Sequence, residues 1–89
     1  MLSLKEINEE LATVDNWSLE DEALSKNFSF SNFSEAGNFV SKIAELSEQL
    51  KHHPDIIWSY DRVKLMLTTH SEKCLTKKDF ELAREIDKI

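Results

Sequence analysis

The near absence of glycine and proline is the strongest constraint on what this chain can fold into. Its 89 residues include one glycine, Gly37, and one proline, Pro54. Gly37 lies within a helical pattern, so the glycine-rich loops that cradle phosphates or dinucleotides are excluded. Proline-rich linkers are excluded for the same reason. A chain of 89 residues has room for one small domain and not for two, so we expect residues 1–89 to form a single domain.

The charges are distributed unevenly along the chain. Lys and Arg total 11 and Asp and Glu total 17, which gives a net charge of −6. Residues 1–50 hold 3 basic and 10 acidic residues, a net of −7, whereas residues 51–89 hold 8 and 7, a net of +1. An acidic chain without a basic stripe is poorly suited to bind nucleic acid. The nearly neutral second half is the better place for a site that accepts an electron-rich small molecule.

Cysteine content and hydropathy restrict the setting of the protein. The single cysteine, Cys74, excludes an intrachain disulfide and a zinc site built on cysteines. No run of 18 apolar residues exists, so we expect no membrane partner. The first residues lack the basic and apolar regions of a signal peptide. These features favour a reducing, cytoplasmic environment.

The first thirty residues predict a helix followed by a hairpin. Ser3 and Glu6 form a capping-box pattern, and apolar residues at helical spacing predict a helix over residues 3–14. Apolar and polar residues alternate on both sides of the acidic turn at residues 20–22. This alternation predicts two strands with an aromatic apolar face, formed by Trp17, Leu19, Leu24, Phe28 and Phe30.

A second, longer helix follows the hairpin. Ser31 or Asn32 is suited to cap it, and it should run to about Leu50, because Pro54 disfavours helix at the residue before it. The residues expected on its apolar stripe are Phe33, Ala36, Val40, Ile43, Ser47 and Leu50, widened by Phe39 and Ala44.

The second half predicts another hairpin and a last helix. Residues 56–60 and 63–70 are β-prone, with Asp61 and Arg62 as the turn between them. Thr76 is suited to cap the last helix, with Asp79 at its third position. The order α-β-β-α-β-β-α indicates an α+β fold, a four-stranded antiparallel sheet with the helices packed on one face. The other face is open to solvent or to a partner subunit.

The three histidines are the candidates for chemistry. His52 and His53 follow the second helix, and His70 ends the fourth strand, so they share a pocket if these ends are neighbours. Histidine acts as acid and as base near neutral pH. The alternatives are that His52 or His53 is an exposed residue favoured by the helix dipole and that His70 is a solvent-facing strand end. A metal site is disfavoured, because adjacent histidines do not easily bind one ion.

Other candidates also have structural alternatives. Glu48 is an ordinary solvated helix residue in the simpler interpretation, and Asp79 is an N-terminal capping carboxylate. Trp58 and Tyr60 are able to stack on a flat ligand, although packing is the commoner use of aromatic residues on a strand.

Three segments together resemble the pterin-4a-carbinolamine dehydratase family. They are Glu48 to Asp55, which contains His-His-Pro at residues 52–54, then Thr68-Thr69-His70, and Leu75 to Asp79. His-His-Pro alone is a weak motif, but its combination with Tyr60 and the two later segments at these spacings is specific. A weaker similarity upstream extends the resemblance to about residues 15–87.

The resemblance implies the same fold and a lyase activity. The expected reaction is the dehydration of 4a-hydroxytetrahydrobiopterin to quinonoid dihydrobiopterin and water in pterin recycling, with no metal and no organic cofactor. It implies that His52 and His70 serve in acid–base catalysis and that His53 helps to hold the pterin. Glu48, one helical turn before His52, is expected to orient that ring or raise its basicity. The further expected substrate-binding residues are Pro54, Trp58 and Asp79.

Two residues depart from the family pattern, at the rim of the expected pocket. Lys51 stands where many members carry Asp, and Ile56 stands where an aromatic residue is common. The expected partners are the pterin substrate, an aromatic amino acid hydroxylase and copies of the same chain, as a dimer or tetramer. A thin core and an exposed sheet edge also favour an oligomer. The alternative function is an interaction module, a dimerisation cofactor or assembly factor, but the three retained histidines favour the enzyme.

Overall fold

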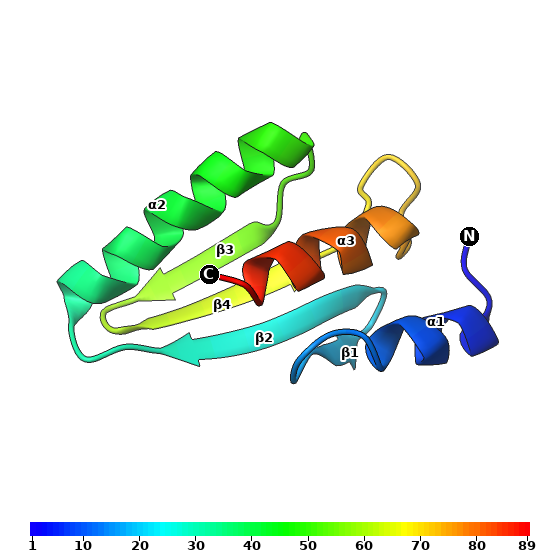
Figure 1. Ribbon diagram of the computed structural model, residues 1–89, viewed down its shortest axis with the longest axis horizontal. Coiled ribbons are helices and arrows are strands. Elements are labelled where there is room, and N and C mark those ends of the chain that lie inside the picture. Colours follow the sequence, from blue (N-terminus) through cyan, green and yellow to red (C-terminus); the bar gives the residue numbers. More distant parts are fainter.

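The predicted α+β architecture is confirmed by a computed structural model, which describes residues 1–89 (Figure 1). The strands form one antiparallel sheet in the order β1-β2-β4-β3. None of the helices has the length and apolarity needed to cross a membrane. The elements in chain order are α1 (Leu4–Leu11), β1 (Ser18–Glu20), β2 (Ala23–Ser29), α2 (Phe33–Leu50), β3 (Asp55–Ser59), β4 (Arg62–Leu67) and α3 (Lys77–Ile86).

The helix starts follow the capping residues in the sequence. Ser3 and Glu6 form the predicted capping box of α1, and Thr76 and Asp79 form that of α3. Asn32 caps α2, since its side chain accepts from the backbone N–H of Glu35 at 2.9 Å. These side chains satisfy backbone donors that a helix leaves unpaired at its start.

Helix α1 is shorter than the predicted range of residues 3–14. It ends at Leu11, and the hydroxyl of Thr13 donates to the carbonyl of Glu10 at 2.6 Å. Such a local side-chain bond offers the backbone an alternative to helix. Asn16 then adopts a left-handed conformation with φ 58°, which turns the chain toward β1.

The second hairpin differs from the prediction at both ends of β4. The turn lies at Tyr60 and Asp61, because Tyr60 has a left-handed φ of 51° and Arg62 already pairs with Ser59. Strand β4 ends at Leu67 instead of residue 70. His70 therefore lies in the loop that follows β4, within the hairpin-like turn closed by the bridge of Thr69 with Cys74.

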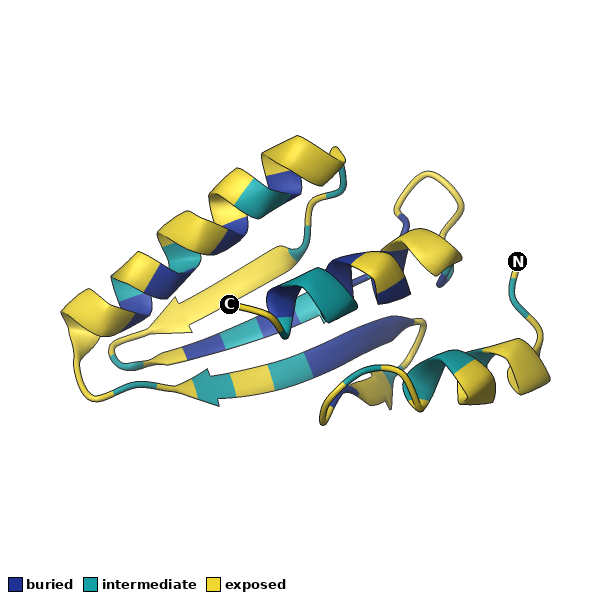
Figure 2. Cartoon of the chain, viewed as in Figure 1, coloured by how far each residue is buried: buried dark blue, intermediate teal, exposed yellow.

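The core lies between one face of the sheet and helices α2 and α3 (Figure 2). Alternate residues of β4 face this core, since Val63, Leu65 and Leu67 are buried. The predicted stripe of α2 is wrong at its ends, where Phe33 is 55% exposed and Leu50 is 40% exposed. The buried residues of α2 are Ala36, Phe39, Ile43 and Ser47, and Ala44, expected to widen the stripe, is exposed.

The opposite face of the sheet carries mostly polar side chains, with the apolar Ile57 and Met66 among them. Lys64 on β4 reaches across the sheet to Glu20 on β1, with an Nζ–Oε distance of 3.1 Å. The hydrogen bond from Lys64, followed by one from Ser25, lowers the pKa of the Glu20 carboxyl. This face is thus solvated and carries no apolar core of its own.

Strand β3 forms an exposed edge of the sheet. All five of its residues are exposed (Figure 2), and only its β4 side is paired. Trp58 stacks on Phe33 of α2, with ring centroids 4.6 Å apart, and its indole N–H donates to the carbonyl of Tyr60 at 2.9 Å. A Cβ at Gly37 would lie 3.1 Å from the Trp58 ring, so the single glycine lets this ring approach α2.

Substitution of Gly37 tests this close approach. We expect Gly37→Leu to lower the free energy of unfolding by about 1–3 kcal/mol, because the larger side chain displaces the Trp58 ring. In a Trp58→Ala background the same substitution should stabilise by up to about 0.8 kcal/mol, the gain in helix propensity. Denaturant unfolding of the four proteins measures both values. Equal costs in the two backgrounds would show that Trp58 does not restrict this position.

Candidate active site

The end of α2 directs His52 toward α3. Lys51 adopts the left-handed conformation, with φ 53° and ψ 40°, and the N–H of His52 bonds to the carbonyl of Ser47 at 3.1 Å. This bond across five residues is the helix ending known as a Schellman motif. It reverses the chain immediately after α2, so His52 no longer continues the helical spiral.

His52 binds the carboxylate of Asp79 in the first turn of α3. The distance from Nε2 to Oδ1 is 2.5 Å, and the Asp79 side chain is wholly buried. The other carboxylate oxygen accepts from the Thr69 hydroxyl and from the Thr76 backbone N–H, each at 2.9 Å. Both oxygens are thus hydrogen-bonded, as a buried carboxylate requires.

This contact fixes which nitrogen of His52 is available for chemistry. A carboxylate only accepts hydrogen bonds, so Nε2 of His52 carries the hydrogen that it donates to Asp79. Nδ1 forms no hydrogen bond within the chain and is the nitrogen free to take or give a proton. The ring is 13% exposed, which leaves it reachable from the surface.

The other two histidines are more exposed, and each also faces a carboxylate. His53 Nε2 lies 2.7 Å from Glu48 Oε2, and His70 Nε2 lies 3.8 Å from Asp55 Oδ1. The His53 and His70 side chains are 62% and 64% exposed. Exposed pairs of this kind contribute at most about 1 kcal/mol each, so their main effect is to orient the rings.

One cleft brings the three histidines together. Its volume is about 230 Å³, and its lining contains no apolar side chain. The lining residues are Lys51, His52, His53, Thr68, Thr69, His70, Ser71 and Lys78. They come from the end of α2, the end of β4 with its following loop, and the start of α3. The sequence prediction that these chain ends converge is therefore correct in its geometry.

Four other predicted site residues lie outside the lining of this cleft. Glu48 contacts His53 and not His52, because the chain reversal at Lys51 breaks the one-turn spacing. The Asp79 side chain is wholly buried and reaches the cleft lining through its bonds to His52 and Thr69.

Pro54 and Trp58 also lie outside the lining of the histidine cleft. Pro54 stands between His53 and the start of β3 and is not part of the lining. Trp58 is near the opposite end of β3, where it packs on Phe33. Within one chain, neither residue contributes a wall to the histidine cleft.

The sequence interpretation missed three residues that support the site. Asp55 faces His70, while Thr69 and Thr76 hold the Asp79 carboxylate. Antiparallel pairing of Asp55 with Met66 sets the start of β3 beside the end of β4. The two predicted strands and the tight turn between them were therefore the sequence features that could have indicated the contact of Asp55 with His70. No group of three or more His, Cys, Asp or Glu side chains is arranged to hold a metal ion.

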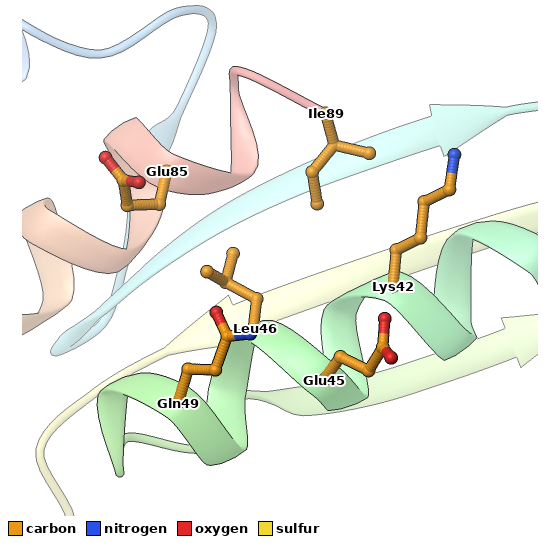
Figure 3. A pocket seen from close by; sticks show the side chains of 6 residues that line it. All are labelled: Lys42, Glu45, Leu46, Gln49, Glu85 and Ile89. Carbon is orange, nitrogen blue, oxygen red and sulfur yellow. The ribbon is translucent and has the colours of Figure 1, made fainter.

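A separate groove lies between α2 and α3 (Figure 3). It has a volume of about 280 Å³ and is lined by Lys42, Glu45, Leu46, Gln49, Glu85 and Ile89. It contains no histidine and no buried acid–base pair. The histidine cleft is therefore the candidate active site.

Comparison with known proteins assigns the family. The family model described as pterin 4 alpha carbinolamine dehydratase matches residues 1–89. A provisionally named pterin-4-alpha-carbinolamine dehydratase of Sulfolobus acidocaldarius is 47% identical over 88 residues, which cover 99% of this chain and 97% of the relative. A relative of the same name in Chloroflexus aurantiacus is 49% identical, covering 99% and 95%. The chain belongs to the pterin-4-alpha-carbinolamine dehydratase family.

Solved structures agree with this assignment. A transcriptional coactivator/pterin dehydratase from Brucella melitensis superposes with a TM-score of 0.92 and 38% identity, covering 98% of this chain and 95% of that one. A pterin dehydratase-like protein described as a RuBisCO assembly factor of the alpha-carboxysome superposes with a TM-score of 0.67 over 82% and 84%. At 22% identity, the second likeness shows the shared fold alone.

Replacing the buried carboxylate tests the assignment of the His52 nitrogens. An amide at position 79 in Asp79→Asn donates to Nε2 of His52, so the neutral ring should move its hydrogen to Nδ1. We also expect a loss of about 1–3 kcal/mol in the free energy of unfolding. Nitrogen-15 NMR of the neutral imidazole reads the tautomer, and Asp55→Asn is the control that should leave His52 unchanged. A wild-type His52 with its hydrogen on Nδ1 would contradict the assignment.

Proposed function

We propose that the protein is a lyase that dehydrates 4a-hydroxytetrahydrobiopterin to quinonoid dihydrobiopterin and water. The observation that carries the proposal is the cleft lined by His52, His53 and His70, in a chain that belongs to this family. The substrate loses hydroxide from C4a and a proton from N5. Hydroxide is a poor leaving group, so one group must protonate it while another accepts the N5 proton.

His52 and His70 are the proposed acid and base. Nδ1 of His52 is free because Asp79 occupies Nε2, and the buried carboxylate holds the ring in a fixed orientation. His70 approaches the same cleft from the loop after β4, with Asp55 beside it. Two histidines reaching one flat ring from different elements can exchange roles between the two stereoisomers of the carbinol. Each proton transfer contributes typically 10²–10⁴-fold to the rate.

His53 is the proposed binding residue. It is more exposed than His52, and Glu48 lies 2.7 Å from its Nε2, which orients the ring at the cleft. Glu48 is thus a positioning residue for His53 in this proposal. Asp79 has the same role for His52. The substrate is a 4a-hydroxy compound, so an enzyme that forms it, an aromatic amino acid hydroxylase, must supply it. The dehydration then returns quinonoid dihydrobiopterin for reduction.

Single substitutions of the histidines test these roles. We expect His52→Ala and His70→Ala to lower kcat by about 10²-fold or more while retaining part of the activity, since the other histidine and water cover one transfer. His53→Ala should mainly raise KM, because it removes a binding contact. Stopped-flow measurement with freshly generated 4a-hydroxytetrahydrobiopterin gives both constants.

The double variant separates shared from independent roles. We expect His52→Ala combined with His70→Ala to fall well below the product of the two single losses, because no acid–base group remains. Activity close to either single variant would mean that the two histidines act as one unit. If all three single variants remain folded and match wild type, the catalytic proposal fails and an interaction role replaces it.

We also propose a homo-oligomer in which β3 is the joining edge. A strand with one side unpaired is able to pair with a second copy, and all five β3 residues are exposed. Ile57 is 56% exposed and Ile56 is 37% exposed, so pairing would cover apolar surface as well. Dimer and tetramer are both compatible with this contact.

A charge placed on this edge tests the oligomer. Light scattering at micromolar concentration should show a dimer or tetramer for wild type, and Ile57→Lys should shift it toward monomer. Lys42→Glu, on the exposed face of α2, is the control and should keep the oligomer. A wild-type protein that is monomeric and fully active would contradict the proposal.

A further inference from the structure

The histidine cleft continues into a second cavity. This cavity has a volume of about 340 Å³ and shares Lys51, His52 and Lys78 with the cleft. Its remaining lining residues are Gln49, Leu50 and Glu81. Lys51 and Lys78 thus line both hollows, and a substituent on a flat ring held against the histidines would lie beside these two lysines.

The two lysines at this junction carry uncompensated charge. Neither Lys51 nor Lys78 takes part in an ion pair within 4 Å. The carboxylates of Asp79 and Glu48, which lie nearby, are bound by His52 and His53. The histidine cleft is lined by no carboxylate, and the second cavity is lined by one carboxylate, Glu81, against the two lysines.

Lys78 lies at the start of a helix, where the helix dipole favours an anion. Lys77 and Lys78 occupy the first turn of α3, at the positive end of the helix dipole. Cations are unfavourable there and anions are favourable. A bound anion beside Lys78 would be stabilised by the lysine and by the helix start at once.

We propose that this site favours pterin substrates whose side chain ends in an anionic group, a phosphate ester or a carboxylate, held between Lys51 and Lys78, over those with the neutral side chain of biopterin. The inference rests on the proposed function, because it needs the pterin ring in the histidine cleft. The anionic group lies in the second cavity, away from the reacting C4a and N5 atoms. Lys51 and Lys78 thus determine substrate specificity and take no part in the proton transfers.

Calorimetric titration with matched pterins tests the proposal. The first pair is 7,8-dihydroneopterin and its 3′-monophosphate, which differ only in the phosphate. The second pair is 6-hydroxymethylpterin and 6-carboxypterin, which tests a carboxylate. We expect the anionic member of at least one pair to bind wild type roughly tenfold tighter, the effect of two partly exposed charge contacts. The pair that shows the preference identifies the anion.

Charge-removing variants locate the preference. Lys51→Asn keeps a residue that tolerates the left-handed conformation, and Lys78→Gln keeps the length of the side chain. The double variant with both substitutions should bind the anionic and the neutral member of each pair almost equally, and neutral pterins should still bind. Lys42→Gln removes the same charge from the separate groove between α2 and α3 and should keep the preference.

Salt supplies a test on unmodified protein. The preference of wild type should shrink as ionic strength rises from about 0.01 M to about 1 M, over which the Debye length falls from about 30 Å to about 3 Å. Equal binding of both members of both pairs at low salt would overturn the inference and leave the proposed function intact. Absence of binding by every pterin would overturn both. A preference that persists in the folded double variant would also contradict the role of the lysines.

Discussion

The buried carboxylate of Asp79 is the interaction on which both the fold and the candidate site depend. It joins the end of α2 through His52, the segment after β4 through Thr69, and the start of α3 through Thr76. A carboxylate this deeply buried is costly unless all its hydrogen bonds are made. Removing one partner of such a buried group lowers the free energy of unfolding by about 3–5 kcal/mol. The three chain segments are therefore held together at the point where the histidines meet, so folding and preorganisation of the cleft come from the same contacts.

Much of the local structure was predictable because its causes are local. Caps depend on residues three positions apart, so Ser3 and Thr76 marked their helices correctly. The burial of alternate β4 residues follows from the twofold period of a strand. The contact of His52 with Asp79 joins residues 27 positions apart, and no pattern in either segment contains it. It depends on how the end of α2 packs against α3.

Two of the predicted site residues, Glu48 and Trp58, lie away from the lining of the histidine cleft for geometric reasons. Glu48 and His52 would share a helix face if α2 continued, but Lys51 reverses the chain, and His53 folds back to Glu48 instead. Trp58 lies on the predicted strand, yet alternation along a strand gives only the face and not the distance. Four residues of strand separate it from Pro54 by about 13 Å, at about 3.3 Å per residue.

The most direct test of the central claim is a crystal structure of the protein with 7,8-dihydrobiopterin. The account predicts the pterin ring in the histidine cleft, with its N5 edge within about 3 Å of Nδ1 of His52 or of the His70 ring. It also predicts that Nε2 of His52 remains bonded to Asp79 in the complex. A pterin bound in the groove between α2 and α3, or in the cleft with both histidine rings turned away from N5 and C4a, would contradict the account.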